Sequence, residues 1–76
     1  MHTLLSVIAC KTSDFKVCKE CGCINWYENE ECHNCGGSKF DESKEAVERW
    51  VKFEYEFWIK TEGYTEAEAD DVLIDV

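Results

Sequence analysis

The hydrophobic positions between residues 47 and 60 fit two different periodicities. Residues 51, 53, 55, 57 and 59 are apolar and mostly alternate with charged residues, which is a strand pattern made of good strand formers. On a helical wheel, the same stretch gathers an apolar face, with Glu54 inside it, of Val47, Trp50, Val51, Phe53, Phe57 and Trp58. We favour the helix because capping signals bracket one unbroken segment and no turn residue interrupts it.

Both ends of this expected helix carry capping signals. At the start, a side-chain oxygen of Asp41 or Ser43 can accept hydrogen bonds from the free N–H groups of the first turn. At the end, Gly63 can take the left-handed conformation of a helix stop, with an apolar contact between Ile59 and Tyr64. The segment between these signals is therefore predicted to be one continuous helix.

A second helix is expected directly after this stop. Thr65 and Glu68 form a Thr-x-x-Glu capping box, and helical spacing relates the apolar residues Ala69, Val72, Leu73 and Val76. The start of the chain favours a β-strand, because a sheet suits the apolar residues Leu4, Leu5, Val7 and Ile8. The pattern predicts a small α+β fold: a cysteine-rich region with an N-terminal strand over residues 1–40, and a helical hairpin packed on it over residues 41–76.

The length of the chain makes an additional stabilising element necessary. The chain has 76 residues, of which six are cysteine and none is proline. A chain this short forms one domain, and its apolar core rarely contributes more than about 3–5 kcal/mol. Domains of this size usually need a bound metal or disulfides. The six cysteines are the residues that could supply either.

The net charge of −9 is concentrated in the second half. Residues 41–76 carry twelve acids and four bases, whereas residues 1–40 carry five acids and four bases. Nucleic-acid binders usually present a basic stripe, so nucleic acid is an unfavourable partner. Anionic lipid surfaces would repel the chain for the same reason. No membrane span is expected either, because the longest apolar stretch, residues 4–10, is far shorter than about 20 residues.

Four of the cysteines form two Cys-x-x-Cys pairs with ten residues between them, made of Cys18, Cys21, Cys32 and Cys35. A glycine follows each pair, where a tight turn often needs a positive φ. Four thiolates suit a tetrahedral Zn²⁺ with every position filled, which makes the metal structural rather than catalytic. Disulfides would need an oxidising compartment, and no secretion signal is visible. We therefore expect one Zn²⁺ ion in preference to iron, and a reducing, cytoplasmic environment.

The segment from residue 18 to residue 40 resembles a zinc ribbon, in which paired Cys-x-x-Cys-Gly knuckles lie on short β-hairpins. It also resembles the Ran-binding-protein-type zinc finger, a family with four cysteine ligands and the pattern Cys-x2-Cys-x3-Asn-x6-Cys-x2-Cys. The residues that meet this pattern without a gap are Cys18, Cys21, Asn25, Cys32 and Cys35. The resemblance covers about a third of the chain. It implies a four-cysteine zinc ribbon within residues 1–40, in which the Asn25 amide ties the two knuckles together through backbone hydrogen bonds.

The chain departs from that family at the positions that recognise ligands. RNA-binding members use arginines beside a stacking aromatic between the cysteine pairs, but here Trp26 and Tyr27 are followed by three acids that would repel phosphate. Ubiquitin-binding members use a Thr-Phe pair where this chain has Gly22 and Cys23. Lys16 stands where the family usually has Trp. The resemblance therefore supports the fold and the metal, and weakens both familiar ligands.

Several residues outside the metal ligands need an explanation. Cys10 and Cys23 are expected to be small buried hydrophobic residues, the usual role of a free cysteine. His33 is not expected to bind the metal, because the x positions of a Cys-x-x-Cys turn point away from it. A carboxylate on an apolar face, such as Glu54, is usually paired locally, and it is also a candidate for binding. The aromatics beside the knuckles could cover them or join a partner-binding surface, for which the candidates are Trp26, Tyr27, Trp50, Glu54 and Trp58.

These features favour a non-enzymatic protein-interaction module with a structural zinc. Its acids and aromatics suit a protein partner with a basic surface, reached by electrostatic steering. By compositional analogy with phage-encoded regulators, it could inhibit or regulate a host protein by mimicking nucleic acid. The alternatives are a rubredoxin-like electron-transfer protein, whose knuckles stand much further apart, and a nucleic-acid binder acting through the near-neutral residues 1–40. No nucleophile–base pair, open metal site or phosphate loop indicates an enzyme.

Overall fold

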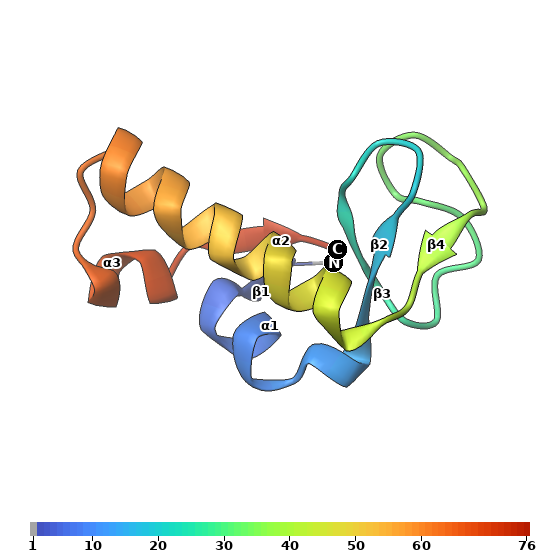
Figure 1. Ribbon diagram of the computed structural model, residues 1–76, viewed down its shortest axis with the longest axis horizontal. Helices are drawn as coiled ribbons and strands as arrows, with labels where there is room; N and C mark the ends of the chain where they lie inside the picture. The colour runs from blue at the N-terminus through green and yellow to red at the C-terminus, as the bar shows by residue number, and fades with distance from the viewer. Residues whose placement is uncertain (1) are drawn as a thin grey trace.

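Short helices and strands make up the fold over residues 2–76, the part of the chain that the computed structural model describes. In chain order they are β1 (His2–Leu4), α1 (Leu5–Cys10), the 3-10 turn η1 (Thr12–Asp14), β2 (Phe15–Cys18), β3 (Ile24–Trp26), β4 (Phe40–Asp41), α2 (Lys44–Glu56), the π-helical turn η2 (Phe57–Thr61), α3 (Glu66–Asp70) and β5 (Leu73–Asp75). The predicted small α+β class is confirmed. The cysteine-rich region lies at one end of α2 and α3 at the other (Figure 1).

β2 is the central strand of the first sheet, whose strand order is β3–β2–β4. In the antiparallel β2–β3 hairpin, Phe15 is paired with Trp26 and Val17 with Ile24. On the other side of β2, residues 17 and 18 pair with β4. The first Cys-x-x-Cys pair therefore begins at the end of β2, and the second lies in the long connection between β3 and β4.

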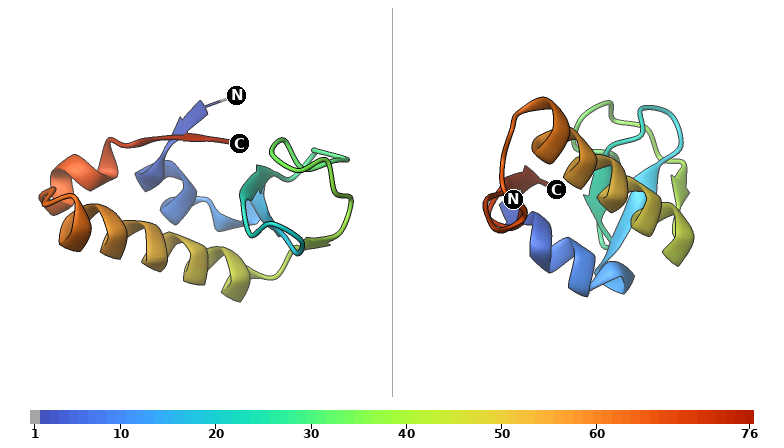
Figure 2. Two further views of the ribbon diagram at one scale, coloured as in Figure 1. Left: turned by 90° about the horizontal axis from the view of Figure 1, so that it is seen from above. Right: turned by 60° about the vertical axis from the view of Figure 1, so that its left-hand side comes forward.

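The second sheet joins the two ends of the described chain, because β1 pairs with β5 in antiparallel register, with Thr3 opposite Ile74. The predicted N-terminal strand is wrong beyond residue 4, where helix α1 begins. Leu5 and Ile8 have no exposed surface, and their spacing places both on one face of a helix. α1 contacts both α2 and α3 (Figure 2). Burial of these two large apolar side chains therefore favours helix over sheet here.

Helix, rather than strand, is confirmed for residues 44–61, where α2 continues directly into η2. Ser43 is the N-cap: its hydroxyl accepts a hydrogen bond from the backbone N–H of Ala46 at 3.2 Å. Asp41 supports this start by accepting a bond from the N–H of Ser43 at 3.0 Å. Both residues proposed as caps thus act at the beginning of the helix: Ser43 caps the first turn, and Asp41 accepts a hydrogen bond from the backbone of Ser43.

The helix ends at Gly63 as predicted, with a φ of 73°. The contact that accompanies this stop is one residue away from its predicted position. The backbone N–H of Tyr64 donates to the carbonyl of Trp58 at 2.9 Å, and the two rings pack with their centroids 5.1 Å apart. The last turn is a π-helix, which is wider than an α-turn. Trp58 therefore takes the place predicted for Ile59.

The predicted second helix is correct at its start and wrong at its end. Thr65 and Glu68 form the expected capping box, with both reciprocal hydrogen bonds at 3.2 Å. However, α3 ends at residue 70, and β5 follows in place of a longer helix. Residues 72–76 alternate in burial, with Leu73 66% exposed and Val76 3% exposed. This alternation suits a strand with one buried face, and β1 supplies the strand with which it pairs.

The core lies between α2, the β2–β3 hairpin and the C-terminal strand, and its buried residues are Ile8, Phe15, Ile24, Val47, Val51 and Val76. The buried face of α2 differs from the predicted one at Phe53, which is 77% exposed. At about 100° per residue, Phe53 lies roughly 120° around the helix axis from Val47, too far to share its environment. None of the helices within residues 2–76 has both the length and the apolar character needed to cross a bilayer.

Candidate metal centre

The first cysteine knuckle is built at the turn of the β2–β3 hairpin. The backbone N–H of Cys18 donates to the carbonyl of Cys23 at 2.9 Å, and the N–H of Gly22 donates back to the carbonyl of Cys18 at 2.9 Å. Gly22 has a φ of 78°, a left-handed conformation that side chains disfavour. This glycine lets the chain reverse while the sulfurs of Cys18 and Cys21 stay on the same side.

The second knuckle repeats these hydrogen bonds without belonging to a hairpin. The N–H of Cys32 donates to the carbonyl of Gly37 at 2.7 Å, and the N–H of Gly36 donates to the carbonyl of Cys32 at 2.9 Å. Gly36 has a φ of 77°, close to that of its counterpart in the first knuckle. The two Cys-x-x-Cys-Gly segments therefore fold into the same local structure, as the sequence repeat predicts.

The two knuckles bring four sulfur atoms together, all within 4.8 Å of one another, from Cys18, Cys21, Cys32 and Cys35. The contacts between knuckles are the short ones: the Sγ atoms of Cys18 and Cys35 are 3.6 Å apart, and those of Cys21 and Cys32 are 3.5 Å apart. Among residues 2–76, this is the one group of three or more His, Cys, Asp or Glu side chains gathered so closely. These four residues could hold a metal ion.

The surroundings of the sulfurs shift the ionisation of Cys32 and Cys35 in opposite directions. Backbone N–H groups two residues downstream donate to the Sγ atoms of Cys18, Cys32 and Cys35, each at 3.4 Å. Burial opposes ionisation of Cys32, but hydrogen bonds from the N–H of Cys35 and from the Asn25 amide lower the pKa of its thiol to about 6. At Cys35 the N–H of Gly37 favours the thiolate, yet the neighbouring thiols raise the pKa to about 12. Because thiolates are the metal-binding form of cysteine, binding a metal here would release protons.

Asn25 links the two knuckles from a fully buried position. Its amide nitrogen donates to the carbonyl of Cys23 in the first knuckle at 3.3 Å and to the Sγ of Cys32 in the second at 3.4 Å. Its amide oxygen accepts from the N–H of His33 at 3.0 Å and from the side chain of Asn29 at 3.1 Å. The predicted linking role of Asn25 is thus confirmed.

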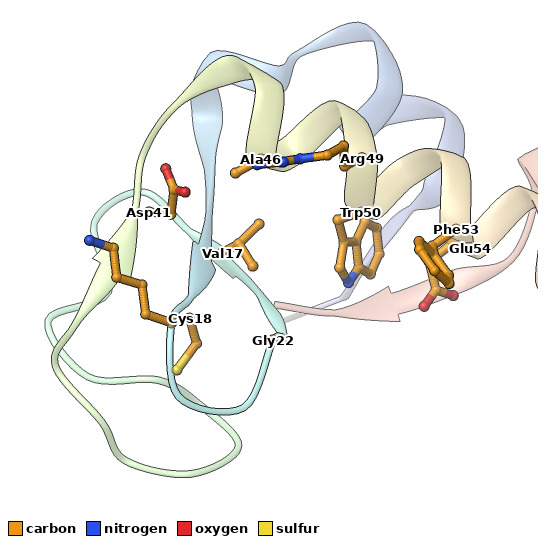
Figure 3. Close-up of a pocket in the computed structure, with 10 residues that line it drawn as sticks. Val17, Cys18, Gly22, Asp41, Ala46, Arg49, Trp50, Phe53 and Glu54 are labelled. Carbon is orange, nitrogen blue, oxygen red and sulfur yellow. The ribbon is translucent and has the colours of Figure 1, made fainter.

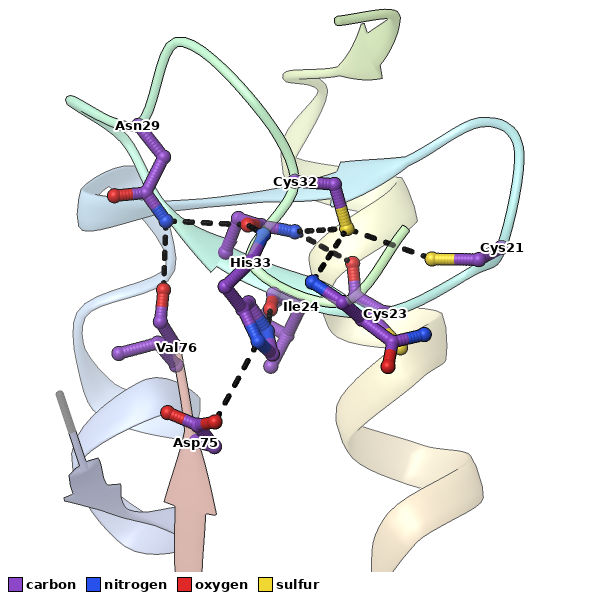
Figure 4. Close-up of polar contacts among 10 residues, drawn as sticks. Cys21, Cys23, Ile24, Asn29, Cys32, His33, Asp75 and Val76 are labelled. Carbon is purple, nitrogen blue, oxygen red and sulfur yellow. Dashed lines mark hydrogen bonds and ion pairs between the residues drawn. The ribbon is translucent and has the colours of Figure 1, made fainter. Parts of the chain in front are cut away.

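Hydrogen bonds also tie the second knuckle and its loop to the end of the chain. The side chain of Asn29 donates to the carbonyl of Val76 at 2.7 Å. The ring of His33 donates to the carbonyl of Ile24 at 2.8 Å through Nε2, and its Nδ1 lies 3.6 Å from a carboxylate oxygen of Asp75 (Figure 4). His33 therefore contributes to packing between the knuckle and β5, and it is absent from the group of metal-binding side chains.

The two remaining cysteines do not fit the prediction that both are buried. Cys10, at the end of α1, is exposed. Cys23 is half-buried beside the first knuckle, where desolvation and the neighbouring Cys21 thiol raise its pKa to about 11. Neither belongs to the cluster of four sulfurs. The prediction failed at Cys10 because α1 turns only its Leu5–Ile8 face inward.

Lys16 occupies the position where the resembled family usually has tryptophan. It is only 8% exposed, and its ammonium lies 4.0 Å from the centre of the Phe40 ring. The same ammonium donates to the backbone carbonyl of Asn29 at 2.5 Å. Lys16 thus joins β2, β4 and the loop between the knuckles. At this position, the cation–π contact with Phe40 stands where the resembled family usually has a tryptophan ring.

The predicted partner-binding residues separate into two groups. Trp26 and Tyr27 pack on each other with their ring centroids 4.8 Å apart, and Trp26 also covers part of the core. Trp50, Glu54 and Trp58 lie together along α2 and η2, where the indole N–H of Trp58 donates to a carboxylate oxygen of Glu54 at 3.2 Å. Glu54 is therefore paired locally, with an indole as its partner.

Two hollows meet at Trp50 and Glu54. One, of about 480 Å³, lies between α2 and the first knuckle and also involves Val17, Ala46 and Phe53 (Figure 3). The other, of about 310 Å³, lies between that knuckle and β5 and also involves Ile24, Leu73 and Asp75. The hydrophobic pattern did not predict that Phe53 and Leu73 are exposed, because it assigned both residues to buried helix faces. The helical angle of Phe53 was a signal that could have found it, whereas nothing in residues 69–76 singled out Leu73.

Comparison with family profiles, curated proteins and solved structures returned no match to this chain. The resemblance to the Ran-binding-protein-type zinc finger therefore remains a prediction carried by the cysteine motif.

Proposed function

We propose that the protein is a non-enzymatic interaction module held together by one structural Zn²⁺ ion. A regular tetrahedron with Zn–S bonds of about 2.3 Å has edges of about 3.8 Å. The sulfur–sulfur contacts of 3.6 Å and 3.5 Å between the knuckles are close to this value. Zinc bound by four thiolates would cross-link the knuckles and contribute folding free energy, with no coordination position left for a substrate. Native mass spectrometry of the purified chain tests this part, because it measures metal identity and number together.

The observation that carries the interaction role is the exposure of Phe53 on the acidic half of the chain. Phe53 is 77% exposed, Leu73 is 66% exposed and Phe57 is 45% exposed. Exposed aromatics that line hollows are typical of binding surfaces, whereas scattered apolar residues need no explanation. Here Phe53 borders the larger hollow and also a smaller one that continues along the helix beside Phe57.

The partner supported by the charge is a protein with a basic surface. Residues 41–76 carry twelve acids against four bases, so such a partner would be attracted before contact and held at short range by the exposed aromatics. A compact acidic surface could also compete with nucleic acid for a basic site, which would make the protein an inhibitor or regulator. Free thiols for the metal would be maintained in a reducing compartment such as the cytoplasm.

Affinity capture with the zinc-loaded full chain tests this proposal. The immobilised protein should bind a partner saturably at about 0.15 M salt, and binding should weaken as salt rises. Phe53→Ser should reduce capture of that partner. Tyr27→Ser changes the exposed aromatic of the other candidate group, outside the acidic half, and should preserve capture if the acidic half carries the interaction. The absence of any saturable partner, or loss of capture only with Tyr27→Ser, would contradict the proposal.

A further inference from the structure

The two hollows at Trp50 adjoin each other. Both are lined by Gly22, Trp50 and Glu54. We refer to the two hollows together as the Trp50 groove, and its lining includes Val17, Ile24, Trp50, Phe53, Glu54 and Leu73. The groove extends along the first knuckle from the side that faces α2 to the side that faces β5, with Trp50 and Glu54 projecting from α2 (Figure 3).

The larger half of the Trp50 groove is apolar and electrically balanced. Val17, Trp50 and Phe53 provide apolar surface there. The charged residues that line it are Lys19, Arg49, Asp41 and Glu54. Hydrogen bonds from Ser43, together with the charges of Lys19 and Arg49, lower the pKa of Asp41. The two carboxylates and the two cations therefore offset one another in net charge. This half would accept an uncharged apolar side chain.

The smaller half of the groove is acidic. Glu54 and Asp75 line it, together with the apolar side chains of Ile24 and Leu73. Among the described residues, no lysine or arginine lines this half; His33 does, and it lies 3.6 Å from Asp75. The adjoining knuckle would hold four thiolates around a divalent ion, leaving about two further negative charges nearby. An anion would be repelled from this half and a cation attracted.

We propose that the Trp50 groove binds a protein segment that presents an arginine or lysine next to an apolar residue; this inference rests on the proposed interaction function. The cation would enter the smaller half, with its aliphatic stem against Leu73 and Ile24, its charge toward Glu54, and the Trp50 ring available for a cation–π contact. The neighbouring apolar side chain would fill the larger half. Glu54 accepts one bond from Trp58, and a carboxylate has the capacity to accept several.

A second copy of the chain fits this groove less well than a basic partner. Each copy carries a net charge of −9, so two copies repel each other. Charge complementarity therefore selects a basic segment of another protein.

The test uses the zinc-loaded full chain and capped synthetic peptides with a central Leu–Arg pair flanked by glycine and serine. A matched peptide carries citrulline in place of arginine, which keeps the shape and removes the charge. The chain has three tryptophans, so indole N–H signals in two-dimensional NMR report on separate sites. The arginine peptide should shift the signal of Trp50 and leave Trp26 unchanged. The citrulline peptide should bind about tenfold more weakly or worse.

Two variants separate the groove from the general acidity of the helix. Glu54→Gln keeps an oxygen that can accept from Trp58, and should weaken binding of the arginine peptide about tenfold. Glu48→Gln makes the same charge change on the same helix at an exposed position paired with Lys44, outside the groove, and should have little effect. Equal losses in both variants, equal affinity for both peptides, or shifts confined to Trp26 would each overturn the groove assignment. So would a Trp50 signal that moves with protein concentration alone, since a second copy would then fill the groove.

The outcome is distinguishable from failure of the proposed function. If affinity capture finds a saturable basic partner that binds Glu54→Gln and wild-type protein equally, the interaction role stands and the groove assignment fails. If capture finds no partner, the interaction role fails, whatever the peptides show.

Discussion

Replacing the buried Asn25 by alanine should strongly destabilise the cysteine-rich region. The side chain is fully buried and makes four hydrogen bonds, to Cys23, Cys32, His33 and Asn29. At a net contribution of about 1 kcal/mol each, their loss amounts to about 4 kcal/mol. A domain of this length typically has a total stability of roughly 4–11 kcal/mol. Asn25→Ala should therefore leave the protein close to the limit of folding.

The same substitution should also weaken metal binding. The Asn25 amide donates to the Sγ of Cys32 and helps to lower the pKa of that thiol, so its removal makes the thiolate less favourable. Loss of a group that orients a ligand in this way typically reduces metal affinity 10–100-fold. Competition with a chromogenic zinc chelator measures this effect separately from unfolding.

Urea unfolding followed by tryptophan fluorescence measures the change in stability. Ser38→Ala is a suitable control, because Ser38 is exposed and belongs to the same connection between β3 and β4. Its free energy of unfolding should stay within about 0.5 kcal/mol of the wild type. If Asn25→Ala matches this control in both stability and zinc affinity, then the Asn25 hydrogen bonds do not hold the knuckles together, and the reasoning is refuted.

Three other substitutions test separate parts of the structure. Val47→Ala should cost about 1.5–3 kcal/mol in urea unfolding, whereas Phe53→Ala should change stability by less than about 0.5 kcal/mol; similar costs would contradict the assigned helix face. Cys18→Ser should abolish zinc binding in native mass spectrometry and unfold the cysteine-rich region, whereas Cys10→Ser should retain one zinc, and equal loss would make Cys10 a ligand. Burial and the bond to Asp70 raise the pKa of Tyr55 in the folded protein, whereas a tyrosine in the unfolded chain loses its proton near pH 10. The free energy of unfolding should therefore fall above pH 10 in the wild type, and it should fall less steeply in Tyr55→Phe. Unfolding curves that shift identically with pH in both proteins would exclude this role.

The cysteine-rich region was predictable because its structure is set by short-range chemistry. Each knuckle depends on a glycine after the second cysteine and on hydrogen bonds between residues four or five apart, which a sequence motif specifies completely. Asn25 could be assigned from the same motif. Lys16 could not, since its buried ammonium depends on Phe40, which lies on another strand.

The C-terminal strand was not predictable from its own residues. Residues 69–76 fit a helical period and an alternating period equally well, and the choice is made by β1, at the opposite end of the chain. Similarly, the short segment from Leu5 to Cys10 contains too few residues to show a helical period. At both places, tertiary pairing decided what local pattern left open.

The pairing of β1 with β5 has a consequence for the order in which the protein folds. The two sulfur pairs are close along the chain, whereas His2 and its partner Asp75 are separated by almost its full length. Closing the longer loop costs roughly 1 kcal/mol more conformational entropy than bringing Cys18 to Cys35. The knuckles can therefore form on the emerging chain, before the last strand has been synthesised. The terminal sheet then closes late, and a chain stalled before residue 73 would keep its metal-binding segment while leaving its apolar core uncovered.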